Sequence, residues 1–183
     1  MATKEIGFFL QDQTIGTNLI TVLENNGVDF IFGIPGVHTV EIYRGLIHTS
    51  IRHITARHEQ GAGFMADGYA RVTGNPGVCL VISGPGVTNI LTPMAQARAD
   101  SIPMLVISGV NKLSDIQNDR GALHALPDQS ALVKQIALES FTINTEQDVS
   151  DSVNKAFDIL NSARPGPVHI QLPVNIMNKK FER

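Results

Sequence analysis

The sequence has no tryptophan, a single cysteine and only 5% aromatic residues among its 183 positions. With so few large rings, the core must be built from aliphatic side chains, and one cysteine cannot form a disulfide within the chain. Cys79 stands inside the apolar run 78–82, a setting that predicts a buried core thiol and not a reactive one. A chain of this length can still bury one sizeable core without disulfides or metals.

Long apolar runs and clustered basic residues are also missing. No stretch approaches the ~20 apolar residues of a membrane span, and the N-terminus lacks the order of a secretory signal. The net charge is −3, and the 14 lysines and arginines are scattered, so nothing indicates a nucleic-acid surface. These absences predict a cytoplasmic protein whose partners include neither nucleic acid nor membrane.

Short apolar runs alternate with helical patterns along the chain. Runs such as 78–82 are continuously apolar, as in strands that are covered on both faces. Segments 15–23 and 149–160 instead repeat their apolar residues at helical spacing. The alternation predicts an α/β fold, with an open, mostly parallel sheet and helices on both faces. Strands are expected at 28–32, 51–55, 78–82, 104–108 and 168–172, with a weaker one at 141–143. Residues 111–129 are expected to form a loop, with a short helix left open.

Glycine-bearing or polar turns follow four of the expected strands. They span residues 33–36, 57–61, 83–89 and 108–111. The carboxyl ends of parallel strands share one edge of the sheet, and ligands bind at that edge. Ordinary turns between strands and helices use the same residue types, so the pattern alone leaves a ligand site and plain turns both open.

Glu59 is the residue that points most sharply to chemistry. It begins an expected helix that runs to about residue 72, where the helix dipole favours a carboxylate, so a purely structural role stays open. Small side chains on this helix would let another backbone approach closely and would leave the carboxylate poorly solvated. Desolvation raises a carboxyl pKa and the dipole lowers it, which favours proton transfer near neutral pH. The small residues are Gly61, Ala62, Gly63, Ala66, Gly68 and Ala70.

Phosphate-loop and metal-site patterns fit the sequence poorly. Segment 84–89 begins like G-x-G-x-x-G, but Asn89 replaces the third glycine and the segment follows the third expected strand. No spacing of metal ligands is found, so no metal site is predicted. His53 and His58 are interpreted as structural, whereas His38, His48 and His169 have no partner that the sequence identifies.

Four segments, taken in their order and spacing, closely resemble a known family. They are 33–36, 57–71, 84–89 and 163–170. Together they are similar to the N-terminal pyrimidine-binding (Pyr) domain of thiamine-diphosphate-dependent enzymes of the acetolactate synthase group. The resemblance extends from about residue 14 to residue 173. It implies that residues 1–183 form a single flavodoxin-like Pyr domain.

The resemblance also implies a cofactor, an activity and residue roles. Thiamine diphosphate would be the cofactor, and the activity would be decarboxylation of a 2-oxo acid or its joining to a second carbonyl. Glu59 would be catalytic, hydrogen-bonding the ring nitrogen N1′ of the aminopyrimidine and favouring its imino tautomer. The resemblance places Pro35 and Gly36 in the aminopyrimidine pocket, with Gly84, Thr88 and Asn89 in a second lining loop.

Two features depart from that family. The sequence contains no Gly-Asp-Gly motif, with which the family's C-terminal PP domain holds the diphosphate through Mg²⁺. We therefore expect an excised domain of a larger enzyme, inactive by itself, with a subunit of a split decarboxylase as the alternative. Residues 121–129 contain Leu-His-x-Leu-Pro-Asp-Gln, which is more similar to a guanidino-oxopentanoate decarboxylase-like branch. His124 becomes a candidate substrate contact, with a surface-loop histidine equally open.

The expected partners follow from the same resemblance. They are a small-molecule 2-oxo acid, the PP domain of the full-length enzyme or of a partner subunit, and a second copy in a homodimer or tetramer. Binding of FAD stays open. Two alternatives are a non-catalytic flavodoxin-like module that binds a nucleotide or flavin, and a domain that only dimerises.

Overall fold

The computed structural model describes residues 13–112, 114–115 and 121–181. It contains one six-stranded sheet in which every pair of neighbouring strands is parallel, with the order β2-β1-β3-β4-β6-β5. The strands are β1 (Phe30–Gly33), β2 (Arg52–Thr55), β3 (Gly77–Val81), β4 (Met104–Val110), β5 (Glu139–Thr142) and β6 (Pro167–Pro173). The predicted open parallel sheet is therefore confirmed.

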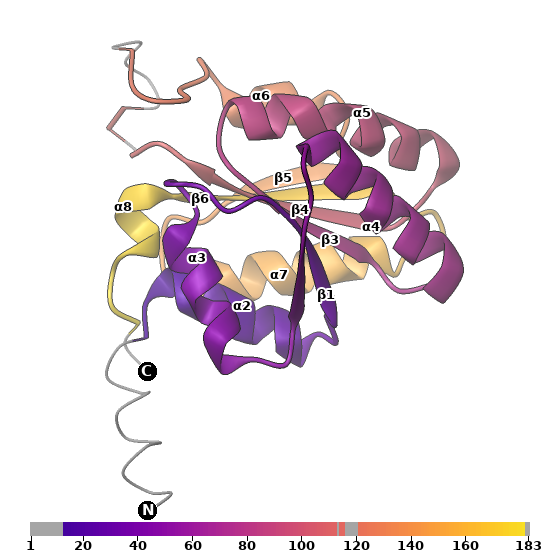
Figure 1. Cartoon of the computed structure of the whole chain (residues 1–183), viewed down its shortest axis with the longest axis horizontal. Helices are drawn as coiled ribbons and strands as arrows, with labels where there is room; N and C mark the ends of the chain where they lie inside the picture. Colours follow the sequence, from indigo (N-terminus) through magenta and orange to yellow (C-terminus); the bar gives the residue numbers. More distant parts are fainter. Residues whose placement is uncertain (1–12, 113, 116–120, 182–183) are drawn as a thin grey trace, which may run out of the picture.

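Helices cover both faces of the sheet (Figure 1). One apolar cluster joins the sheet to α2 and α7, and a second joins the opposite face to α4, α5 and α6. The helical elements are α2 (Ile15–Asn25), α3 (Val40–Arg44), the 3₁₀ helix η1 (Gly45–His48), α4 (Glu59–Thr73), α5 (Pro85–Asp100), α6 (Gln129–Lys134), α7 (Gln147–Leu160) and α8 (Val174–Met177).

The central strands show why their sequences are continuously apolar. Successive side chains of a strand point to opposite faces. Val78 and Leu80 accordingly belong to the cluster under α2 and α7, and Cys79 and Val81 belong to the cluster under α4 and α5. Cys79 is fully buried, and burial raises the pKa of its thiol, which confirms the predicted core cysteine.

Local signals in the sequence explain two helix ends. Gly27 follows α2 with a φ of 80°, as expected for a left-handed helix stop, and its N–H bonds the Glu24 carbonyl. Before α7, the Thr145 N–H donates to Asp148 at 2.9 Å and the Asp148 N–H donates back to the Thr145 hydroxyl at 3.3 Å. This is the reciprocal pairing of a capping box.

The starts of two strands differ from those expected. Strand β1 begins at Phe30 and not at residue 28, and β5 begins two residues before the expected 141–143. Residues 111–128 lack helix and strand where they are described, but Gln129 begins the short helix α6. Among the described residues, no helix combines the length and the apolar character needed to cross a membrane.

Candidate functional site

The turns after β1, β2 and β3 meet at the carboxyl edge of the sheet (Figure 1). Ile82 links two of them, because a Cβ added to Gly36 would lie 2.5 Å from its Cδ1 and one added to Gly86 would lie 2.7 Å from its Cγ2. Both glycines are therefore required by close packing against a single side chain. Two of the segments that carry the family resemblance, 33–36 and 84–89, are therefore neighbours in space.

Glu59 and Asn89 come from different segments and contact each other directly. Glu59 is the first residue of α4 and is only 9% exposed. Its Oε2 accepts a hydrogen bond of 2.9 Å from Asn89 Nδ2, which lies on the second turn of α5. The Asn89 amide fixes the orientation of the Glu59 side chain. A buried carboxylate thus stands at the carboxyl edge of the sheet.

The residue before Glu59 has a structural role. His58 is the N-cap of α4, and its Nδ1 accepts a hydrogen bond of 3.1 Å from the Gln60 N–H. His53 packs edge-on against Tyr43, with ring centroids 4.9 Å apart, and burial lowers the pKa of its imidazole. These contacts agree with the structural interpretation of both histidines.

Tyr43 is a neighbour of Glu59 that the sequence analysis missed. Its hydroxyl donates a hydrogen bond of 3.0 Å to the Leu80 carbonyl at the end of β3. Burial raises the pKa of this hydroxyl, and the nearby Cys79 and Glu59 raise it further. Tyr43 therefore stays a neutral donor close to the Glu59 carboxylate. No sequence signal could identify it, because it lies on the short helix α3.

The remaining predicted cofactor contacts have different surroundings. Pro35 and Thr88 are exposed, and the Thr88 hydroxyl donates to the Pro85 carbonyl of its own helix at 3.0 Å. Gly84 has a φ of 61°, and its N–H donates to Gln129 Oε1 at 3.0 Å. The described contacts bring Asn89 to Glu59, but they do not bring Pro35 or Thr88 to it.

A buried polar network lies beside Gly84. Gln129 Nε2 is within 3.0–3.1 Å of Ser108 Oγ, the Gly109 carbonyl and Gln171 Oε1. Ser108 in turn bonds His169 Nε2 at 2.9 Å. The network fastens the start of α6 to β4 and β6, and through Gly84 it reaches the turn after β3. Gln129 was missed as well, because its partners are far away in sequence.

Helix α4 has an inner and an outer face. Ala62, Gly63 and Ala66 are buried within the chain, and a Cβ on Gly63 would collide with Pro93 of α5. A Cβ added to Gly61 or Gly68 would meet no atom within 4 Å, and Phe64 and Met65 on the same helix are 44% and 41% exposed. The small residues expected to meet a partner therefore divide between internal packing and an outward surface.

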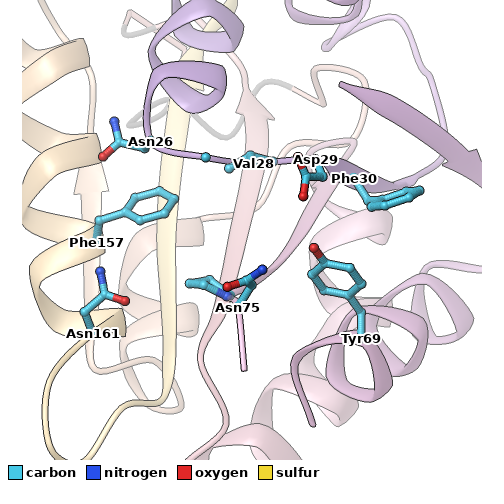
Figure 2. A pocket seen from close by; sticks show the side chains of 10 residues that line it. Asn26, Val28, Asp29, Phe30, Tyr69, Asn75, Phe157 and Asn161 are labelled. Atoms are coloured by element: carbon cyan, nitrogen blue, oxygen red, sulfur yellow. The ribbon is translucent and has the colours of Figure 1, made fainter. Parts of the chain in front are cut away.

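A hollow lies at the opposite edge of the sheet, where the strands begin (Figure 2). Figure 2 shows the rings of Phe157 and Tyr69 and the amide of Asn75 around it. None of the residues that line it belongs to the predicted site. The hollow is therefore separate from the Glu59 edge.

Comparison with known proteins gives a family match. The family described as "Thiamine pyrophosphate enzyme, N-terminal TPP binding domain" matches residues 13–132. This range includes Glu59, Asn89, His124 and Gln129.

Individual relatives include decarboxylases and synthases. A probable 2-ketoarginine decarboxylase of Pseudomonas aeruginosa is 51% identical over 164 residues, which cover 90% of this chain and 29% of that protein. Acetolactate synthase isozyme 1 large subunit of Escherichia coli is 40% identical over 165 residues, 90% of this chain and 29% of that protein. The acetolactate synthase large subunit of Corynebacterium glutamicum is 37% identical over 90% of this chain and 26% of its own length. The chain thus spans less than a third of each of these relatives.

Proposed function

The chain belongs to the family of N-terminal TPP binding domains of thiamine pyrophosphate enzymes, and we propose that Glu59 is its catalytic carboxylate. In this proposal residues 1–183 form one Pyr domain, and the central and PP domains lie outside this sequence. The whole enzyme would be a 2-oxo-acid decarboxylase or carboligase. The observation that carries the proposal is the buried Glu59 carboxylate, which Asn89 holds at the carboxyl edge of the sheet.

The residues at this edge fit an aminopyrimidine. A ring nitrogen needs a carboxylate that is shielded from water, and Glu59 supplies one. Gly36 and Gly86 let the turns after β1 and β3 pack closely on Ile82, which keeps these two turns side by side at this edge. When bound, thiamine diphosphate supplies the electron sink for decarboxylation.

Glu59 and Asn89 would together position a proton for the pyrimidine ring. Asn89 Nδ2 donates a hydrogen bond to Glu59 Oε2, so we propose that the other carboxylate oxygen, Oε1, faces the pyrimidine nitrogen. The carboxylate can take up or release a proton at Oε1 while Asn89 keeps the side chain from rotating. Pro35, Gly36, Gly84 and Thr88 remain proposed pocket residues, and Asn89 is a proposed cofactor contact through its position beside Glu59.

A rival function as a nucleotide-binding module is disfavoured by the same contact. Asn89 stands where a dinucleotide loop would have its third glycine, and its amide is already engaged by Glu59. A buried carboxylate next to that loop would repel a phosphate. The pair therefore suits a neutral heterocycle better than a pyrophosphate.

The proposed substrate is a 2-oxo acid. The relative named as a 2-ketoarginine decarboxylase is 51% identical, compared with 40% and 37% for two acetolactate synthases, and this favours decarboxylation of a guanidino 2-oxo acid. The pattern at 121–129 supports the same branch, and His124 is its proposed substrate contact.

We propose that the outward face of α4 is the contact surface for a second copy of the chain. Phe64 and Met65 are exposed beside the open positions Gly61 and Gly68, as at an interface that excludes water. A second copy in a homodimer or tetramer is assigned to this face. Mg²⁺ would be bound by the PP domain and not by this chain. A cytoplasmic location stays a prediction.

Replacement of Glu59 in the assembled holoenzyme tests the proposal. Glu59→Gln keeps the size of the side chain and removes its ability to hold a proton, so kcat should fall by roughly 10²–10⁴. Glu41→Gln is a matched control, because Glu41 is also a first-turn glutamate but lies on α3 beside Arg44. A Glu59→Gln enzyme that folds, binds cofactor and turns over at the control rate would refute the proposal.

A further inference from the structure

The hollow in Figure 2 lies between the ends of two helices. Asn26 is the C-cap of α2 and Asn161 is the C-cap of α7, and both line the hollow together with Phe157 from the last turn of α7. Tyr69 of α4 and Asp29, just before β1, line it across from Phe157. Its volume of about 200 Å³ is below the roughly 300–1,000 Å³ of pockets for drug-sized ligands. The hollow therefore fits a small group and not a nucleotide.

The two helix ends beside the hollow carry negative charge that no basic side chain of their own balances. The C-terminus of a helix has a partial negative charge, and a cation in the last turn is stabilising there. Helices α4, α5 and α6 each have such a residue, which are Arg71, Arg98 and Lys134. The last turns of α2 and α7, both of which the structure describes completely, have none. Two negative helix ends thus border the same space.

Asp29 adds a full negative charge to this space. Its backbone carbonyl accepts a hydrogen bond of 2.9 Å from the Arg52 N–H, which fixes Asp29 at the start of the β1–β2 pair. Its side chain is exposed, and none of the ion pairs between described residues includes its carboxylate. The carboxylate is therefore free to pair with a cation from solution.

The asparagines of the hollow provide hydrogen-bond acceptors. Asn26 Nδ2 donates to the Val22 carbonyl at 2.9 Å, so the group that Asn26 can present to a ligand is its Oδ1. Asn75 and Asn161 bring two further amide oxygens to the lining. Together with the Asp29 carboxylate, these oxygens favour a ligand that is rich in N–H groups.

Aromatic rings give the hollow flat walls. Phe30, Tyr69 and Phe157 line it, and Figure 2 shows the Phe157 ring directed inward. The Arg52 guanidinium lies 5.1 Å from the centroid of the Phe30 ring, so this lining already accepts one guanidinium on a ring face. The charge of Arg52 repels a second cation, and Asp29 and the two helix ends offset that repulsion.

We propose that the hollow binds a small guanidinium compound. Its planar cation would lie against the Phe157 and Tyr69 rings, with its N–H groups on Asp29 and the asparagine oxygens. An alkylammonium group lacks the flat face that suits these rings, and a carboxylate or phosphate would be repelled by Asp29. The site is independent of the proposed catalysis, because none of its lining residues belongs to the Glu59 edge.

The test uses the holoenzyme and methylguanidinium, with N-methylurea as an uncharged counterpart of similar shape. Ligand-observed NMR titration should show methylguanidinium binding, and N-methylurea should bind at least 10-fold more weakly because it cannot form charge-assisted hydrogen bonds to Asp29. Equal affinities of the two compounds would overturn the proposal, and so would undetectable binding of methylguanidinium to the folded enzyme.

Replacement of lining residues locates the binding. Asp29→Asn keeps the size of the side chain and removes its charge, so the methylguanidinium Kd should rise about 10-fold or more. Phe157→Leu should raise it about 3-fold through loss of the aromatic face. Asp151→Asn is the matched control, because Asp151 is an exposed aspartate on the second turn of α7 that does not line the hollow. Its Kd should equal that of wild type, and an equal Kd for Asp29→Asn would overturn the proposal.

Binding at the hollow can be separated from binding at the catalytic edge. Glu59→Gln removes a carboxylate at the opposite edge of the sheet and should leave the methylguanidinium Kd unchanged. A Kd that rises in Glu59→Gln but not in Asp29→Asn would assign the cation to the catalytic edge and overturn the proposal. Thermal melts of each variant show that the comparison is made between folded proteins.

Discussion

The Glu59–Asn89 pair and the Gln129 network are both buried polar contacts near one edge of the sheet, yet their hydrogen bonds are satisfied to different degrees. Gln129 contacts three acceptors through Nε2 and receives the Gly84 N–H at Oε1. Glu59 has one side-chain donor, Asn89, among the described residues. A satisfied network stabilises the fold, whereas a carboxylate with spare acceptor capacity can serve a ligand. The comparison separates residues that build the site from residues that act in it.

Removing Gln129 should have the largest effect on stability. Gln129→Ala leaves the Gly84 N–H and the Gln171 and Ser108 side chains without their shared partner. The free energy of unfolding should fall by about 2–4 kcal/mol, measured by urea denaturation. Gln135→Ala is the control, because Gln135 is exposed just after α6 and should change stability by less than about 0.5 kcal/mol. Equal stability of the two variants would contradict the structural role of the network.

The two faces of α4 should respond differently to a larger side chain. Ala66 is fully buried against Gly77, so Ala66→Leu should destabilise the fold by about 1–3 kcal/mol through overpacking. Gly68→Leu should leave the melting temperature unchanged or higher, because its position is open and leucine favours helix. Light scattering should show weakened assembly for Gly68→Leu. A Gly68→Leu protein that assembles as wild type does would remove this face from the interface.

The buried His169 should make stability depend on pH. Burial lowers its pKa to about 3, so between that value and the unfolded value near 6.5 the unfolded chain binds a proton that the folded chain refuses. This contribution is complete above pH 6.5 and is lost as the pH falls, by about 1.4 kcal/mol per unit within the window. Denaturation curves from pH 4 to 7 measure the slope. His169→Gln should flatten it by about one proton, and an unchanged slope would contradict the assignment.

Thr88 should give the smallest effect. Its exposed hydroxyl is bonded to the Pro85 carbonyl of its own helix, and this bond does not extend to Glu59 or Asn89. Thr88→Ala should change stability by less than about 0.5 kcal/mol and should leave cofactor affinity within about 2-fold of wild type. Calorimetric titration of thiamine diphosphate into the holoenzyme's cofactor-free form measures this. A loss of 10-fold or more would show that Thr88 contacts the cofactor through its side chain and not only through its backbone.

Much of the fold could be predicted because its strongest patterns arise from burial on two faces. Strands β3 and β4 are covered on both sides, so their sequences are continuously apolar and easily located. Strand β5 lies at the sheet edge and is short, which explains its weak signal. The helices α3, α6 and α8 have only four to six residues, too few to display a helical period.

The site was predictable only where its residues belong to local motifs. Glu59 and Asn89 stand in segments with a recognisable order, and the structure brings them into contact. Ser83 and His38 lie 45 positions apart, as do Gly84 and Gln129, and no periodicity links such residues. Their pairing depends on how the strands are ordered in the sheet. The local sequence pattern therefore identified Glu59 as the candidate catalytic residue. The residues that support the site could be identified only from the three-dimensional structure.

The rate of hydrogen–deuterium exchange at the thiazolium carbon of bound thiamine diphosphate tests the central assignment most directly. It should be measured by NMR in wild-type and Glu59→Gln holoenzyme, with thermal melts as the folding control. If the Glu59 carboxylate holds the proton, exchange should slow by roughly 10²–10⁴ while the melting temperature changes little. Exchange at the wild-type rate in a folded, cofactor-loaded Glu59→Gln enzyme would contradict the account.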